Sequence, residues 1–130
     1  MKQNISELAG AIYRVKQQSD IVIGMYFARV FKNAILNEHL FYVPMKRHDS
    51  KTITPVSLKK NGRLYITVFT DLPFVCVADN IEVKAMKMFQ ILQILKHNEQ
   101  IYGISLNPFH KEYSLEINRK NFANIWQFQA

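Results

Sequence analysis

The sequence predicts a single α/β (α+β) domain, in which an N-terminal helical hairpin precedes a mixed sheet of five to six strands with further helices packed on it. Two observations predict this class. Apolar residues recur with helical spacing in residues 1–37, and residues 38–130 alternate β-rich runs with helical segments. With 130 residues and 48% hydrophobic composition, the chain is long enough to bury one core, so residues 1–130 are expected to form one domain.

Residues 1–37 predict two helices. The first carries one apolar stripe, formed by Ile5, Leu8, Ala9, Ile12 and Val15. Asn4 is its expected N-cap, with Glu7 as the capping-box partner, and Ser19-Asp20 offers a break and a second cap. The second helix is expected to end near Leu36. Its first turn is apolar on all sides, which predicts deep packing.

The period then changes to that of strands. Residues 40–45, LFYVPM, predict a strand that ends at Pro44, and residues 52–58 predict a weaker one. Asn61-Gly62 is typical of a hairpin turn. Residues 63–70, RLYITVFT, predict the central strand, because apolar residues occupy both of its faces.

The second half of the chain predicts a similar alternation. A short helical turn is expected at residues 72–75, followed by a strand at 82–86, a helix at 88–96 and strands at 101–108 and 113–117. Asn118 is the expected cap of a last helix, whose inward side chains would be Phe122, Ile125 and Trp126.

In this order and spacing, the strand ends at Tyr42-Val43-Pro44, Phe69-Thr70 and Asn107-Pro108 resemble those of the SseB N-terminal domain family, which is named for enhanced serine sensitivity. The resemblance spans about Leu36 to Ile125. It implies an SseB-like α/β module of the bacterial cytoplasm without established chemistry. The segment FTDLPFV departs from the small polar and acidic residues that usually follow the threonine, so this turn is expected to differ here.

Four polar residues follow two of the predicted strands, namely Thr70, Asp71, Asn107 and His110. The structural interpretation is that their own backbone satisfies them. A residue before proline favours extended backbone, an asparagine often bonds the main chain two residues on, and Thr70 or Asp71 would cap the following turn. The alternative is a ligand-binding rim, which requires the two strands to be parallel neighbours.

The net charge of +7 is concentrated in the middle of the chain. Residues 41–60 carry five cations and one anion, a net +4. The basic patch comprises Lys46, Arg47, Lys51, Lys59, Lys60 and Arg63. A solvated basic loop is the structural interpretation, and a nucleic-acid-binding accessory protein using residues 46–63 is the functional alternative. The aromatic residues in the flanking strands are better explained as core than as a base-stacking platform.

No catalytic or metal-binding constellation emerges from the residue pattern. The four histidines lack the i, i+4 spacing of a helical zinc site, and the four glycines are too scattered for a phosphate loop. The single cysteine, Cys76, lies among apolar neighbours, where a thiol is a poor nucleophile, and it excludes an intramolecular disulfide. We therefore expect no enzyme, no cofactor and no metal.

The expected function is that of a non-enzymatic macromolecular interaction module. Its partner is expected to be a protein, or a second copy in a homodimer, with the two opening helices and the C-terminal NIWQFQA as contact surfaces. Nucleic-acid binding and small-ligand binding at the Thr70/Asn107 rim are the alternatives. The N-terminus does not resemble a secretion signal and the longest apolar run is Ile21 to Ala28, so a cytoplasmic location without membrane insertion is expected.

Overall fold

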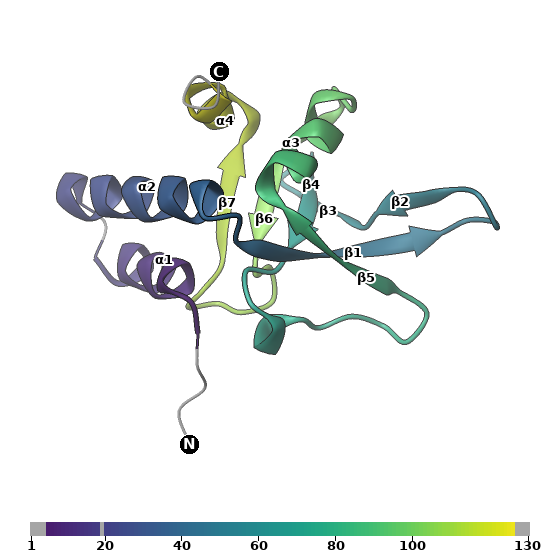
Figure 1. The fold of residues 1–130 in the computed structure, drawn as a ribbon, viewed down its shortest axis with the longest axis horizontal. Coiled ribbons are helices and arrows are strands. Elements are labelled where there is room, and N and C mark those ends of the chain that lie inside the picture. Colours follow the sequence, from purple (N-terminus) through teal and green to yellow (C-terminus); the bar gives the residue numbers. More distant parts are fainter. Residues whose placement is uncertain (1–4, 19, 127–130) are drawn as a thin grey trace.

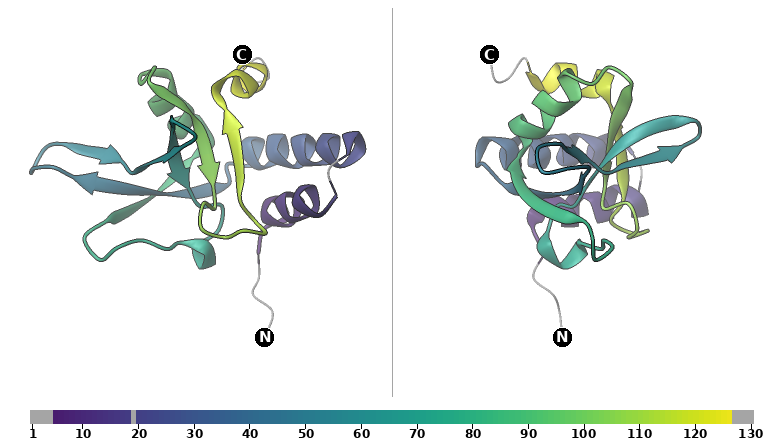
Figure 2. Two further views of the ribbon diagram at one scale, coloured as in Figure 1. Left: turned by 180° about the vertical axis from the view of Figure 1, so that it is seen from behind. Right: turned by 90° about the vertical axis from the view of Figure 1, so that its right-hand side faces the viewer.

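The computed structural model describes residues 5–18 and 20–126, without the side chains of 123–126. Its helices are α1 (Glu7–Gln17), α2 (Ile21–Leu36), the short 3-10 helix η1 (Leu72–Phe74), α3 (Met88–Lys96) and α4 (Arg119–Trp126). Its strands are β1 (Leu40–Arg47), β2 (Ile53–Pro55), β3 (Ser57–Lys60), β4 (Arg63–Val68), β5 (Glu82–Lys87), β6 (Ile101–Leu106) and β7 (Leu115–Asn118). The helical hairpin lies at one end of the molecule, and β1, β2 and β5 extend toward the other (Figures 1 and 2).

The strands of the described residues form two sheets. One is antiparallel with the order β2-β1-β5, and the other has the order β3-β4-β6-β7, in which only β4 and β6 run parallel. This confirms the expected α/β class, with a helical hairpin first and helices packed on the strands. β4 lies inside its sheet, with Tyr65, Ile66 and Val68 all buried, as its two apolar faces predicted.

The expected strand at residues 52–58 is two strands, and they belong to different sheets. Pro55 pairs with Met45 in one sheet, whereas Ser57 pairs with Ile66 in the other. Between them, the Val56 N–H donates to the Pro44 carbonyl (2.9 Å) and the Val56 carbonyl accepts from the Thr67 N–H (3.1 Å). Val56 therefore carries the chain from one sheet to the other and is bonded to both.

Pro44 does not end β1, contrary to expectation. The strand continues to Arg47, and Pro44 lies where the neighbour of β1 changes from Phe69 to β2. Proline has no backbone N–H to donate to a neighbouring strand. It is tolerated at this point because the hydrogen-bond ladder on this edge of β1 is already interrupted between Phe69 and β2. On the same side of β1, Tyr42 and Phe69 exchange two backbone hydrogen bonds of 2.8 Å, which join the two sheets directly.

The caps of the hairpin helices are only partly as expected. Asp20 caps α2 through a 2.9 Å bond from the Ile23 N–H, which confirms that prediction. The N-cap of α1 is Ser6, whose hydroxyl accepts from the Ala9 N–H (3.1 Å), whereas the expected cap, Asn4, lies outside the described residues.

The first turn of α2 is exposed, so the prediction of deep packing is wrong. Ile21, Val22 and Met25 expose 81%, 73% and 68% of their surface, respectively. The reason is that α1 covers only one side of α2, where Ile23 is buried. Two helices cannot bury a turn that is apolar on all sides.

The core lies between the helices and strands of both sheets, because Phe41, Val43 and Met45 of β1 belong to the same buried cluster as residues of β4, β6 and the α-helices. The inward stripe of α3 is buried as predicted, and so is Phe122 of α4, whereas the side chains of Ile125 and Trp126 lie outside the described part. The Asn118 carboxamide accepts from the Asn121 N–H (3.1 Å), which confirms the predicted cap of α4. Among the helices of residues 5–18 and 20–126, none has the length and apolar character needed to cross a membrane.

We expect Gly103→Ala to destabilise the fold by about 3 kcal/mol, the upper part of the range for overpacking a core. A Cβ at this position in β6 would overlap the Ile117 carbonyl oxygen of β7 and lie 2.8 Å from the Asn118 Cα, so the two paired strands would have to separate. Urea unfolding measures the change.

Gly10→Ala is the matched control, because a Cβ there meets nothing within 4 Å and Gly10 lies inside α1. It should raise stability by about 0.5–1 kcal/mol, the usual gain in a helix. Equal effects of the two substitutions would contradict the close approach of β6 and β7.

Candidate functional site

The predicted rim residues do come together. β4 and β6 are parallel neighbours with Val68 opposite Leu106, so the turns after them lie side by side. The Asn107 Oδ1 accepts from the Thr70 N–H (2.9 Å), and its Nδ2 donates to the Thr70 Oγ1 (3.0 Å) and to the Tyr113 carbonyl (3.0 Å). Thr70 and Asn107 are both fully buried. The carboxamide therefore joins the two strand ends, and its hydrogen-bonding capacity is used inside the protein.

The backbone of Asn107 is not extended, although it precedes Pro108. Its φ is +49°, in the left-handed region, which asparagine adopts more readily than other non-glycine residues. Its N–H donates to the Val68 carbonyl of β4 (2.8 Å), and its carbonyl accepts from the His110 N–H (3.0 Å). These bonds outweigh the local preference, and they direct the carboxamide across to Thr70.

Asp71 does not cap η1, contrary to expectation. Its carboxylate accepts from the backbone N–H (2.6 Å) and the hydroxyl (2.8 Å) of Ser6, the cap of α1. Next to it, the Thr70 carbonyl accepts from the His39 Nε2 (2.7 Å). We call Phe69, Thr70 and Asp71 the strand-end junction, because these residues bind β1, the turn after β6 and the start of α1.

His110 also packs inward. Its Nε2 donates to the Phe74 carbonyl of η1 (2.6 Å), and its ring lies 5.0 Å from that of Phe74, centroid to centroid. The four rim residues thus converge on the main chain and on one another. This arrangement favours a structural role for them.

An apolar hollow of about 240 Å³ opens beside the rim. Phe69 and Phe109 lie on its wall, as does Cys76, which has the apolar neighbours that the sequence predicted but is exposed in a loop. Of its polar lining groups, the Thr67 hydroxyl already donates to the Val56 carbonyl (2.9 Å). The hollow has the shape for a small apolar group but lacks the converging polar groups that orient a substrate.

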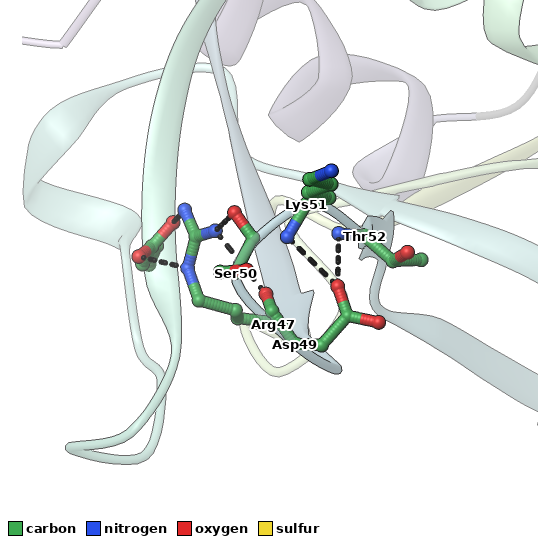
Figure 3. A network of polar contacts seen from close by, with 6 residues as sticks. Arg47, Asp49, Ser50, Lys51 and Thr52 are labelled. Atoms are coloured by element: carbon green, nitrogen blue, oxygen red, sulfur yellow. Dashed lines mark hydrogen bonds and ion pairs between the residues drawn. The ribbon is translucent and has the colours of Figure 1, made fainter.

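The loop between β1 and β2 is ordered by its own polar contacts (Figure 3). Arg47 binds both carboxylate oxygens of Glu82 at 3.0 and 3.1 Å. Asp49 Oδ1 accepts from the N–H groups of Lys51 (2.8 Å) and Thr52 (2.6 Å). The hydrogen bond and charge of Glu82 raise the pKa of Arg47, and the two backbone N–H groups lower the pKa of Asp49.

The basic patch is divided between two hairpins. Lys46, Arg47 and Lys51 lie on the hairpin of β1 and β2, whereas Lys59, Lys60 and Arg63 lie on the hairpin of β3 and β4, in the other sheet. Lys60 pairs with Glu116 (2.7 Å), which raises the pKa of the lysine, and Arg63 lies over the Tyr102 ring at 4.2 Å. Three of the six cations of the basic patch, namely Arg47, Lys60 and Arg63, are therefore in contact with other side chains of the protein.

A groove of about 590 Å³ lies between the two helices of the hairpin, which the sequence predicted as a contact surface without predicting a groove. We call it the hairpin groove; it is lined by Arg14, Val22, Ile23, Met25, Tyr26 and Arg29. The Arg14 guanidinium lies 5.0 Å from the centre of the Tyr26 ring. The sequence feature that could have indicated this groove is the first turn of α2, because a turn that is apolar on all sides fits an exposed binding surface as well as a buried one.

The described residues hold no group of three His, Cys, Asp or Glu side chains placed to bind a metal ion. No protein-family model, curated protein or solved structure matches this chain. The resemblance to SseB N-terminal domains therefore stays a prediction.

Asn107→Ala should lower the free energy of unfolding by about 3 kcal/mol. The substitution leaves the buried Thr70 N–H without its acceptor and places alanine at a left-handed φ. Asn61→Ala is the control, because Asn61 also has a positive φ (+54°) but lies exposed in a turn. It should cost only about 1 kcal/mol, the strain alone. Similar costs for both variants in urea unfolding would mean that the buried hydrogen bonds contribute nothing.

Acid should loosen the β1–β2 loop. The pKa of Asp49 is lowered below its ordinary 3.8, so the carboxylate stabilises the loop above that pH and this stabilisation is lost as pH falls through the lower folded value. The Thr52 amide proton should then shift in NMR spectra, while exposure of the carboxylate leaves global stability nearly unchanged. Asp49→Asn keeps an acceptor without titrating, so its Thr52 amide should stay constant. A shift that persists in this variant would contradict the assignment.

Proposed function

We propose that this chain is a non-enzymatic module, similar to SseB N-terminal domains, that binds another protein through its helical hairpin. The observation that carries the proposal is the exposure of Ile21, Val22 and Met25 beside the hairpin groove. Exposed aliphatic side chains grouped on one face are typical of interaction surfaces, whereas singly scattered ones need no explanation. The C-terminal segment NIWQFQA, the other expected contact surface, lies mostly outside the described residues.

The two alternatives have less support. For nucleic acid, the cations would have to act together, yet they are divided between two hairpins and half of them contact Glu82, Glu116 or Tyr102. For a small ligand at the rim, Thr70 and Asn107 would have to offer polar groups, yet both are fully buried and bonded to each other.

Affinity capture with matched variants tests the proposal. The surface variant Val22→Ser/Met25→Ser removes apolar groups from the hairpin, and the control Leu72→Ser/Phe109→Ser removes groups of similar exposure (63% and 65%) elsewhere. A lysate of the producing cells is treated with nuclease before capture. We expect a protein that the wild type and the control retain and the surface variant loses.

Equal capture by the surface variant and the control would overturn the proposal. Capture that disappears with nuclease, or in Lys46→Gln/Lys59→Gln, would instead favour nucleic-acid binding through the exposed lysines of the basic patch.

A further inference from the structure

We infer that the hairpin groove and the exposed face of α2 bind an amphipathic helix of a partner protein that carries carboxylates in its middle and apolar residues at both ends. This inference rests on the proposed function and adds the chemistry of the partner. It follows from the order of apolar and cationic side chains along α2, from the absence of acidic residues among the described residues that line the hairpin groove, and from the concave shape of the groove.

The exposed face of α2 is one continuous stripe. Its members follow one another at intervals of four, four, three and four residues, and they are Ile21, Met25, Arg29, Lys32 and Leu36, of which Lys32 is half-buried and the other four are exposed. This spacing keeps them on one side of a helix over about 22 Å, at 1.5 Å per residue. The stripe is apolar at both ends, where Ile21 and Leu36 are exposed, and it carries the exposed cation Arg29 in its middle. A complementary helix therefore needs about four turns.

Among the described residues, the charged side chains that line the hairpin groove are both cations, whereas on the other side of α2 the residues Arg29 and Lys32 line a hollow together with Glu116. α2 contains no Asp or Glu, and Asp20 before it is used as the helix cap. Arg29 is exposed at the middle of the stripe, and Arg14 reaches the same groove from α1. Carboxylates of a partner placed between these two guanidinium groups would pair with both, while its apolar side chains cover Val22 and Met25. Such complementarity sets the register and the specificity of docking.

A bilayer fits this pattern less well than a helix does. A helix lying in a membrane interface keeps its cations at the borders of the apolar face, whereas Arg29 lies in line with Met25 and between the two apolar ends. The groove between α1 and α2 is also concave, which suits inserted side chains better than a flat lipid surface.

A second copy of the chain also fits less well. In an isologous contact the same patch meets itself, so Arg14 and Arg29 of one protomer would face the same cations of the other. The chain carries a net charge of +7, which adds to this repulsion.

Designed peptides of about 18 residues serve as probes of this four-turn stripe. The acid-centred peptide has leucines at both ends and glutamates in the middle two turns. The acid-ended peptide has the same composition, with glutamates at both ends and leucines in the middle two turns. The lysine-centred peptide is the acid-centred peptide with each glutamate replaced by lysine. Each is titrated into the ¹⁵N-labelled full chain, and amide shifts report the site and the affinity.

We expect the acid-centred peptide to shift amides of α1 and α2 and to bind about tenfold more tightly than the acid-ended peptide. Arg14→Gln/Arg29→Gln should remove this preference, and Arg14→Glu/Arg29→Glu should transfer it to the lysine-centred peptide. Lys46→Gln/Lys59→Gln removes as many cations from other parts of the surface and should leave the preference intact. Circular dichroism verifies that each variant is folded.

Three results would overturn the inference. The first is equal binding of the acid-centred and acid-ended peptides, or shifts outside the hairpin. The second is binding to phosphatidylglycerol vesicles that depends on Val22 and Met25, which would assign the face to membranes. The third is a dimer in sedimentation that Val22→Ser/Met25→Ser dissociates, which would assign it to a second copy. If the peptides fail while capture still depends on Val22 and Met25, only the partner's chemistry is wrong and the proposed function stands.

Discussion

The contact between the Asn107 carboxamide and Thr70 determines how the two sheets and the helical hairpin are joined. Asn107 follows β6 and bonds Thr70, two residues beyond the end of the parallel neighbour β4, so one side chain joins both strand ends. The strand-end junction then connects the rest. Phe69 exchanges two hydrogen bonds with Tyr42 of β1, and Asp71 binds Ser6 at the start of α1. A buried polar network of this kind is stabilising only when its members are all satisfied.

At the expected ligand rim, the polar groups of Thr70, Asp71 and Asn107 are bonded within the protein. Ligands in open α/β sheets bind beyond the carboxyl ends of parallel strands, and Thr70 and Asn107 occupy such a place. Here the side chains at that edge bind each other, the Tyr113 carbonyl and Ser6, so a ligand would have to compete with intramolecular bonds. Exposed apolar side chains that a partner could cover lie instead on α2.

Much of the fold follows from local patterns, because helical stripes and apolar strands need only neighbouring residues. The buried face of α3, the central position of β4 and the caps Asp20 and Asn118 are of this kind. Contacts between residues far apart in the sequence could not be predicted from such local patterns. Asp71 was expected to serve the helical turn beside it, yet its partner Ser6 lies 65 residues away. Similarly, the chain passes from one sheet to the other at Val56, which is bonded to Pro44 on one side and to Thr67 on the other, and neither residue is its neighbour in the sequence.

Hydrogen exchange at the strand-end junction tests the central claim most directly. If the Asn107 carboxamide joins the two strand ends, the Thr70 amide and the Asn107 side-chain protons should exchange only when the whole protein unfolds. Their exchange free energies would then equal that of global unfolding and match those of buried amides in β4 and β6. Rapid exchange of the Thr70 amide, with β4 still protected, would show that the junction opens locally and that its polar groups are accessible to a ligand after all.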